Sequence, residues 1–149
     1  MKSKWHVAAA AEAFAAGQFA RCGWDVSVQY GANQPEYDLV VVDGDRMWKV
    51  SVKGSRDGSW GLTQSFIKDA NYHAAAEAWF EAHSKMTVLC LVQFKGIEES
   101  ALPRMYLATP NEIKTQLIQT AKGRGDTILY EHKAWGPTAH AAGTVDSIP

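Results

Sequence analysis

The stretch PEYDLVVVDGDRMWKVSVKGS, residues 35–55, carries the clearest structural signal in this sequence. Residues 37–42 form an apolar run of strand length, and residues 43–45 supply turn chemistry around a central glycine. Residues 46–53 then return with alternating apolar and polar side chains, which is the period of a β-strand. The stretch therefore predicts a β-hairpin.

The returning strand has two distinct faces, because successive side chains of a strand point to opposite sides. One face carries Trp48, Val50 and Val52, and the other carries Lys49, Ser51 and Lys53. Asp38 lies early in the first strand. Since a short turn pairs the two strands, we expect Asp38 to lie near the end of the second strand, where Ser51 and Lys53 project together.

The segment before the hairpin predicts one helix and one strand. Residues 5–21 are rich in alanine and free of proline, and Gly23 is well placed as the left-handed residue after a helix. Residues 24–30 alternate, with one face formed by Trp24, Val26, Val28 and Tyr30. The order up to residue 55 is therefore helix followed by three strands.

The segment after the hairpin predicts further helices and strands in alternation. In chain order we expect a helix over 63–83 with Thr63 as its N-cap, a strand over 86–94 covered on both faces and central in the sheet, a strand over 104–108, a helix from Pro110 to about 121, and a strand over 127–131. The hairpin argues against an all-parallel sheet. The fold class predicted is α/β, a mixed β-sheet flanked by helices.

Length and composition predict one domain. The chain has 149 residues, 46% of them hydrophobic, and a formal net charge of -1, which suits a single domain over residues 1–149 with a real core. Residues 132–149 are expected to form an irregular tail. No apolar run reaches the length of about 18 residues that a membrane span needs, so we expect a soluble cytoplasmic protein with no membrane partner.

The cysteines and histidines predict no zinc site. Cys22 and Cys90 are the only cysteines, and both are expected to be small buried hydrophobic residues in a reducing compartment. The five histidines lack a tight ligand spacing such as HxxxH.

Positive charge gathers around the hairpin. Between residues 44 and 68, five cations face two acids, a local excess of three positive charges. Lys49, Arg56 and Lys68 are the candidates for contact with a nucleic-acid backbone, with Lys68 expected on the helix after the hairpin. An ordinary solvated face is the alternative interpretation of the same charges.

Asp38, Lys53 and Glu12 have the chemistry that phosphodiester hydrolysis requires. A magnesium ion held by carboxylate oxygens activates water and stabilises charge on the phosphate, and a nearby lysine orients the water and neutralises the phosphate. Glu12 lies on the first helix, which must pack on the sheet and then either reaches over such a site or faces solvent.

The helix bearing Glu12, followed by GWDVSVQYGANQPEYDLVVVDGDRMWKVSVKGS, resembles the PD-(D/E)xK nuclease superfamily, in particular its small Holliday junction resolvase-like and homing-endonuclease-like members. The resemblance covers roughly residues 5–94. It implies the restriction-endonuclease-like αβββαβ core, with residues 104–131 as a C-terminal β-α-β extension.

The resemblance also implies roles for four residues. Glu12 and Asp38, the latter in a Pro-x-x-Asp segment, would hold Mg²⁺ or Mn²⁺, and Lys53 would complete the catalytic set. Ser51 stands where the family has an acid or glutamine two residues before the lysine. A serine hydroxyl brings no charge, and hard cations are held mainly by charge and ligand number.

Two functions of different kinds follow from this pattern. The first is a metal-dependent endonuclease that hydrolyses DNA phosphodiester bonds and works as a homodimer or higher homo-oligomer, as the resemblance implies. The second is a catalytically degenerate nuclease-fold domain that binds nucleic acid or a protein partner without cleavage. A third interpretation keeps only the fold, as an α/β interaction protein.

Overall fold

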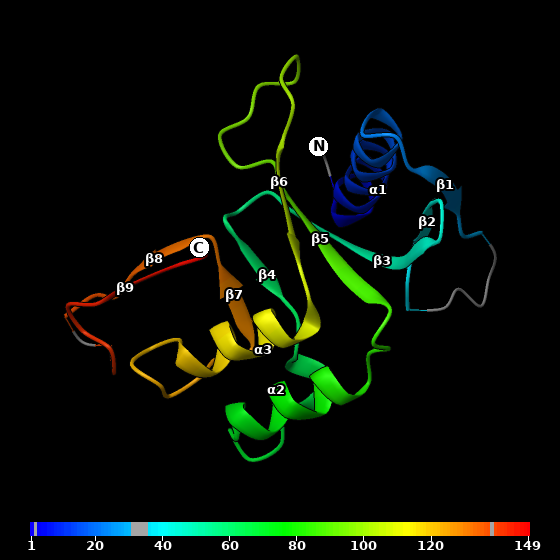
Figure 1. The fold of residues 1–149 in the computed structure, drawn as a ribbon. Helices are drawn as coiled ribbons and strands as arrows, with labels where there is room; N and C mark the ends of the chain where they lie inside the picture. Colours follow the sequence, from blue (N-terminus) through cyan, green and yellow to red (C-terminus); the bar gives the residue numbers. More distant parts are fainter. Residues whose placement is uncertain (2, 31–35, 138) are drawn as a thin grey trace. The chain divides into compact units, whose positions relative to one another are not determined.

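The computed structural model describes residues 1, 3–30, 36–137 and 139–149, and Figure 1 shows how the elements follow one another. Pro35 of the Pro-x-x-Asp segment lies outside the described residues. In chain order the elements are α1 (Lys4–Arg21), β1 (Asp25–Val28), β2 (Leu39–Asp43), β3 (Arg46–Ser55), β4 (Ser59–Gly61), the 3₁₀ helix η1 (Gln64–Phe66), α2 (Tyr72–Glu81), β5 (Thr87–Gln93), β6 (Arg104–Ala108), α3 (Pro110–Gln119), β7 (Ile128–Tyr130), β8 (His132–Ala134) and β9 (Val145–Ser147). The predicted α/β class with a mixed sheet is confirmed.

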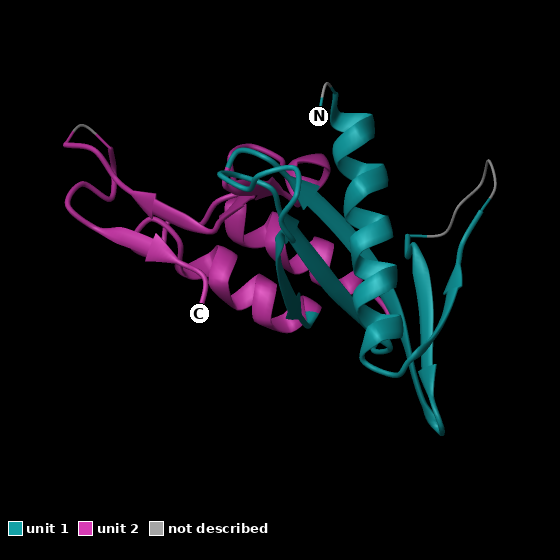
Figure 2. Cartoon of the chain, turned by 90° about the horizontal axis from the view of Figure 1, so that it is seen from above, with its two compact units in different colours: residues 1–57, 85–109 teal, residues 58–84, 110–149 magenta. Residues whose placement is uncertain are grey.

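The chain packs as two compact units, which Figure 2 distinguishes by colour. Unit 1 comprises residues 1–57 and 85–109, and unit 2 comprises residues 58–84 and 110–149. Each unit is therefore assembled from two separate segments of sequence. That the two units fold as a single domain stays a prediction.

Unit 1 is built on a five-stranded sheet in the order β1-β2-β3-β5-β6. β3 and β5 are parallel, and the other neighbouring pairs are antiparallel. The predicted hairpin of β2 and β3 is present, with Leu39 opposite Val50 in the register. β5 has a neighbour on each side and is buried along nearly its whole length, as its continuous apolar sequence predicts.

Helix α1 packs on one face of this sheet, chiefly over β3 (Figure 2). Its buried residues Val7, Ala11 and Ala15 recur at the spacing of one helix face. A side chain at Gly54 would place its Cβ 2.8 Å from the Cβ of Ala11 and 3.0 Å from the carbonyl oxygen of Val7. The helix therefore approaches β3 closely because residue 54 has no side chain.

Unit 2 contains α2, α3 and the two strand pairs β4–β7 and β8–β9. The prediction of a single helix over 63–83 was wrong. Asp69 and Ala70 have positive φ values of 52° and 57°, which interrupt a right-handed helix, and α2 begins only at Tyr72. Asn71 caps it by accepting a hydrogen bond of 3.0 Å from the amide of Ala74.

Three further sequence predictions need correction. The tail over 132–149 is not wholly irregular, because β8 and β9 form a hairpin there. Thr63 precedes η1, and its side chain makes no capping hydrogen bond. Cys22 is exposed, because it is the C-cap residue after the last turn of α1, whereas Cys90 is buried as predicted. No described helix has the length and apolar character that crossing a membrane requires.

Candidate active site at the open end of the β2–β3 hairpin

Asp38 is fixed where the pairing of β2 with β3 ends. Its amide donates to the carbonyl oxygen of Val50 at 2.8 Å, beside the last register pair, Leu39 and Val50. Its side-chain Oδ2 then accepts a hydrogen bond from the amide of Val52 at 2.7 Å. The carboxylate thus replaces the next main-chain acceptor, so the backbone of β3 orients it directly.

Glu12 reaches this position from α1. It follows Ala11, the residue that packs against the backbone at Gly54, and its side chain is partly buried. Burial raises the pKa of Glu12 above its ordinary value, the charge of Asp38 raises it further, and Lys53 lowers it. The charges of Asp38 and Lys53 therefore both reach the carboxylate of Glu12.

The pKa of the Asp38 carboxyl group is also subject to opposing effects. Burial raises its pKa, while the hydrogen bond from Val52 and the charge of Lys53 oppose that rise in part. Both carboxylates are therefore harder to ionise than usual, and the charge of Asp38 contributes to this at Glu12. A cation placed between them would relieve the cost of ionising both, which is the electrostatic condition for a metal site.

Ser51 shares the face of Lys53, as the alternation predicts, but it is only 1% exposed. It stands beside Leu89 of β5 in the register, on the face opposite the one that Val50 and Val52 turn toward α1. A hydroxyl buried to this degree is not open to solvent. Ser51 is thus an interior residue, whereas Lys53 is exposed.

The candidate nucleic-acid contacts have different surroundings. Lys49 is half-buried, with its Nζ 5.2 Å from the ring centroid of Tyr37. Arg56 is exposed and donates from Nη1 to the carbonyl oxygen of Met1 at 2.7 Å. Lys68 is exposed in the loop between η1 and α2 and not on a helix, because α2 begins later than the sequence predicts. It belongs to unit 2, and the other two belong to unit 1.

The donor set fits a hydrated magnesium ion better than a fully protein-enclosed one. Oδ2 of Asp38 accepts one hydrogen bond from Val52 and keeps a second lone pair, so the carboxylates of Asp38 and Glu12 supply the oxygen donors. Magnesium commonly keeps several waters and is held by one or two carboxylates. Within the described ranges, no group of three or more His, Cys, Asp or Glu side chains is arranged to hold a metal ion.

Sequence reasoning missed two parts of this arrangement. The first is the main-chain amide of Val52, which carries no side-chain signal. The second is Gly54, directly after Lys53, which lets α1 approach so closely that the charge of Lys53 lowers the pKa of Glu12. A glycine inside a strand pattern is the signal that indicates such a close approach of backbone.

No protein-family model, curated protein or solved structure was found to match this chain. The assignment of a role to the site therefore rests on its residues and geometry.

Proposed function

We propose that this protein is a metal-dependent endonuclease that hydrolyses DNA phosphodiester bonds. The observation that carries the proposal is that the carboxylate of Asp38 is held by the amide of Val52, the residue before Lys53, where α1 packs closely on β3 and carries Glu12. Two acids and one lysine are the groups that metal-assisted phosphodiester hydrolysis needs.

In this proposal each residue has a separate task. Glu12 and Asp38 hold Mg²⁺ or Mn²⁺, which when bound supplies a Lewis acid and a more acidic water. The amide of Val52 keeps the Asp38 carboxylate in one orientation. Lys53 neutralises the phosphate and orients the attacking water. Lys49, Arg56 and Lys68 contact the DNA backbone, and the protein works in the cytoplasm as a homodimer or higher homo-oligomer.

The test is a cleavage assay with linear, nicked, branched and single-stranded DNA in the presence of Mg²⁺ or Mn²⁺. We expect cleavage of at least one substrate, and its loss in Glu12→Gln, Asp38→Asn and Lys53→Gln. Matched controls are Glu99→Gln, Asp25→Asn and Lys95→Gln, exposed positions of unit 1 that should retain activity. If the wild type cuts none of these substrates with either metal, the enzyme proposal is wrong.

The burial of Ser51 favours a second candidate function, a degenerate nuclease-fold domain that binds nucleic acid or a protein partner without cutting. Where the resemblance calls for a third metal ligand, this chain has an uncharged side chain that is 1% exposed. Oδ2 of Asp38 also accepts a structural hydrogen bond from the amide of Val52.

A DNA-binding titration separates the two candidates. An active site holds phosphate through its metal, so fluorescence anisotropy with labelled DNA should show tighter binding with Ca²⁺, which avoids turnover, than with EDTA. Asp38→Asn should abolish that difference. Under the degenerate alternative, affinity is the same with and without the cation and is insensitive to Asp38→Asn. Salt must be held constant, since phosphate contacts make affinity strongly salt-dependent.

A further inference from the structure

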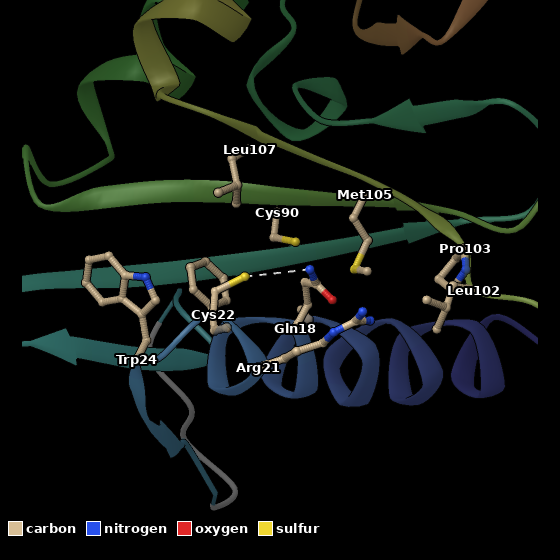
Figure 3. Close-up of a pocket in the computed structure, with 11 residues that line it drawn as sticks. Gln18, Arg21, Cys22, Trp24, Cys90, Leu102, Pro103, Met105 and Leu107 are labelled. Atoms are coloured by element: carbon tan, nitrogen blue, oxygen red, sulfur yellow. Dashed lines mark hydrogen bonds between the residues drawn. The ribbon is translucent and has the colours of Figure 1, made fainter.

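A pocket of about 550 Å³ lies in unit 1 beside the C-terminal half of α1, and no part of the proposed nuclease function uses it (Figure 3). Ala15 and Phe19 of α1 line it together with Cys90 of β5 and Met105 and Leu107 of β6. This volume falls within the range of small-molecule sites, about 300–1,000 Å³. Its walls are therefore mainly apolar and it has the size of a ligand site.

The pocket is separate from the candidate active site. Glu12 and Arg21 are nine residues apart on α1, and at about 100° per residue they point to opposite flanks of the helix. Arg21 lines the pocket, which includes side chains of β6, an edge strand of the sheet. Glu12 instead has its pKa raised by the charge of Asp38, which directly precedes β2 on the other side of β3.

The apolar lining continues onto the exposed edge of the pocket. Leu102 is 58% exposed and Leu107 is 61% exposed, and both contribute to the lining. Covering large exposed apolar side chains with an apolar group removes them from water and lowers the free energy. The pocket thus offers continuous apolar surface from its buried wall at Cys90 to its rim.

One charge faces this surface. Among the described residues that line the pocket, Arg21 is the one with a charged side chain. It lies in the last turn of α1, where the helix dipole favours a cation, and Gln18 is its neighbour one turn earlier. The side-chain amide of Gln18 donates to Sγ of Cys22 at 3.7 Å, so the polar groups of the lining gather along α1 (Figure 3). An apolar wall opposite one guanidinium suits a ligand with an apolar chain and a single negative end.

We propose that this pocket binds an amphipathic carboxylate of the fatty-acid type, with its acyl chain against Phe19, Met105 and Leu107 and its carboxylate at Arg21. Charge complementarity selects the carboxylate, because a guanidinium forms bidentate hydrogen bonds with it. The apolar walls favour the acyl chain of the ligand. Such binding is an activity additional to phosphodiester hydrolysis and does not depend on it.

The thiol of Cys22 provides the readout, since it is exposed and lines the pocket. The rate of its alkylation by iodoacetamide is followed by mass spectrometry of the peptide that contains it. Burial raises the pKa of Cys90 to about 11, which keeps that second thiol slow to react. We expect decanoate to slow the alkylation of Cys22 in a saturable way, below the concentration at which it forms micelles.

Chain length and charge are varied separately. From octanoate to decanoate the affinity should rise about fourfold for each added methylene, the factor that corresponds to its burial. Arg21→Gln should weaken decanoate about threefold to fivefold, as for an exposed ion pair, and leave decanol unchanged. Arg56→Gln removes a cation of unit 1 that does not line the pocket and should leave both affinities unchanged. Leu107→Ser should weaken decanoate and decanol alike.

Three results would overturn the proposal. The first is alkylation of Cys22 that decanoate does not slow. The second is equal loss of decanoate binding in Arg21→Gln and Arg56→Gln, which would mean a general charge effect. The third is protection of Cys22 that increases with protein concentration alone and accompanies a dimer in sedimentation, because a second copy would then cover this face.

Discussion

Replacing Gly54 by alanine tests how α1 is positioned over β3. The new Cβ would lie 2.8 Å from the Cβ of Ala11, where carbon atoms in contact prefer about 3.5–4.0 Å. It would also lie 3.0 Å from the carbonyl oxygen of Val7, a main-chain atom that no side-chain rotation can remove. The helix must therefore move outward by roughly 1 Å, or the strand must yield by a similar distance.

The cost should be that of an overpacked core, about 1–3 kcal/mol. For a chain of 149 residues, this corresponds to a fall of roughly 2–12 °C in Tm. Gly54 is not among the glycines with positive φ, so the loss would come from steric overlap and not from backbone conformation. Thermal unfolding followed by circular dichroism measures it.

Two companion variants make the test specific. Gly17→Ala lies in α1 with nothing within 4 Å of the new Cβ, so it should raise the stability by about 0.5–1 kcal/mol through helix propensity. Ala11→Gly in the Gly54→Ala background removes the closest overlap and should recover part of the lost stability. A Gly54→Ala protein as stable as the wild type would refute the close approach of α1, and with it the explanation for the position of Glu12.

The remaining predictions concern the site and unit 2. Because the pKa values of Glu12 and Asp38 are raised in the folded protein, their contribution to stability is greatest below the ordinary pKa values of 4.5 and 3.8 and is lost as the pH rises through the folded values. Glu12→Gln should therefore raise Tm relative to the wild type at neutral pH and not near pH 3, and an equal difference at both pH values would contradict this. Under the proposed function, millimolar Mg²⁺ should raise the Tm of the wild type but not that of Glu12→Gln in a thermal-shift assay, and identical shifts would exclude Glu12 as a ligand. In unit 2, Gly125→Ala should destabilise more than Gly123→Ala, since both glycines have similar φ values of 86° and 85° but only the Cβ at 125 would meet His73, at 2.9 Å; equal unfolding midpoints would show that this overlap is relieved freely.

The hairpin, the mixed sheet and the first helix were predictable because each has a strong local signal. Continuous apolar residues and a glycine turn define β2 and β3 whatever surrounds them. The late start of α2 was not predictable in the same way. Residues 63–71 have apolar side chains at helical spacing, yet Asp69 and Ala70 adopt left-handed conformations, and alanine carries no sequence signal for that.

One part of the candidate site could be predicted from local sequence, and another part depends on tertiary packing. The spacing of Asp38 and Lys53 follows from the register of one hairpin, so the sequence is enough to bring them together. The approach of Glu12 depends on how closely α1 packs at Gly54, which is a tertiary contact. The exposure of Cys22 likewise depends on what covers the C-terminal end of α1, and a cysteine at a helix end looks the same in sequence whether it is buried or exposed.

The net charge of the candidate site determines how tightly it can bind a divalent cation. Glu12 and Asp38 with Lys53 leave one net negative charge when all three are ionised. An acid in place of Ser51 would make two, and the affinity of a hard cation rises with that charge. Yet residue 51 is only 1% exposed, and a carboxylate buried there would need a partner to offset its desolvation. The buried serine therefore avoids the desolvation cost of a carboxylate but adds no charge that would bind a cation. Under the proposed function, catalysis should require a higher Mg²⁺ concentration than a site with three acids would.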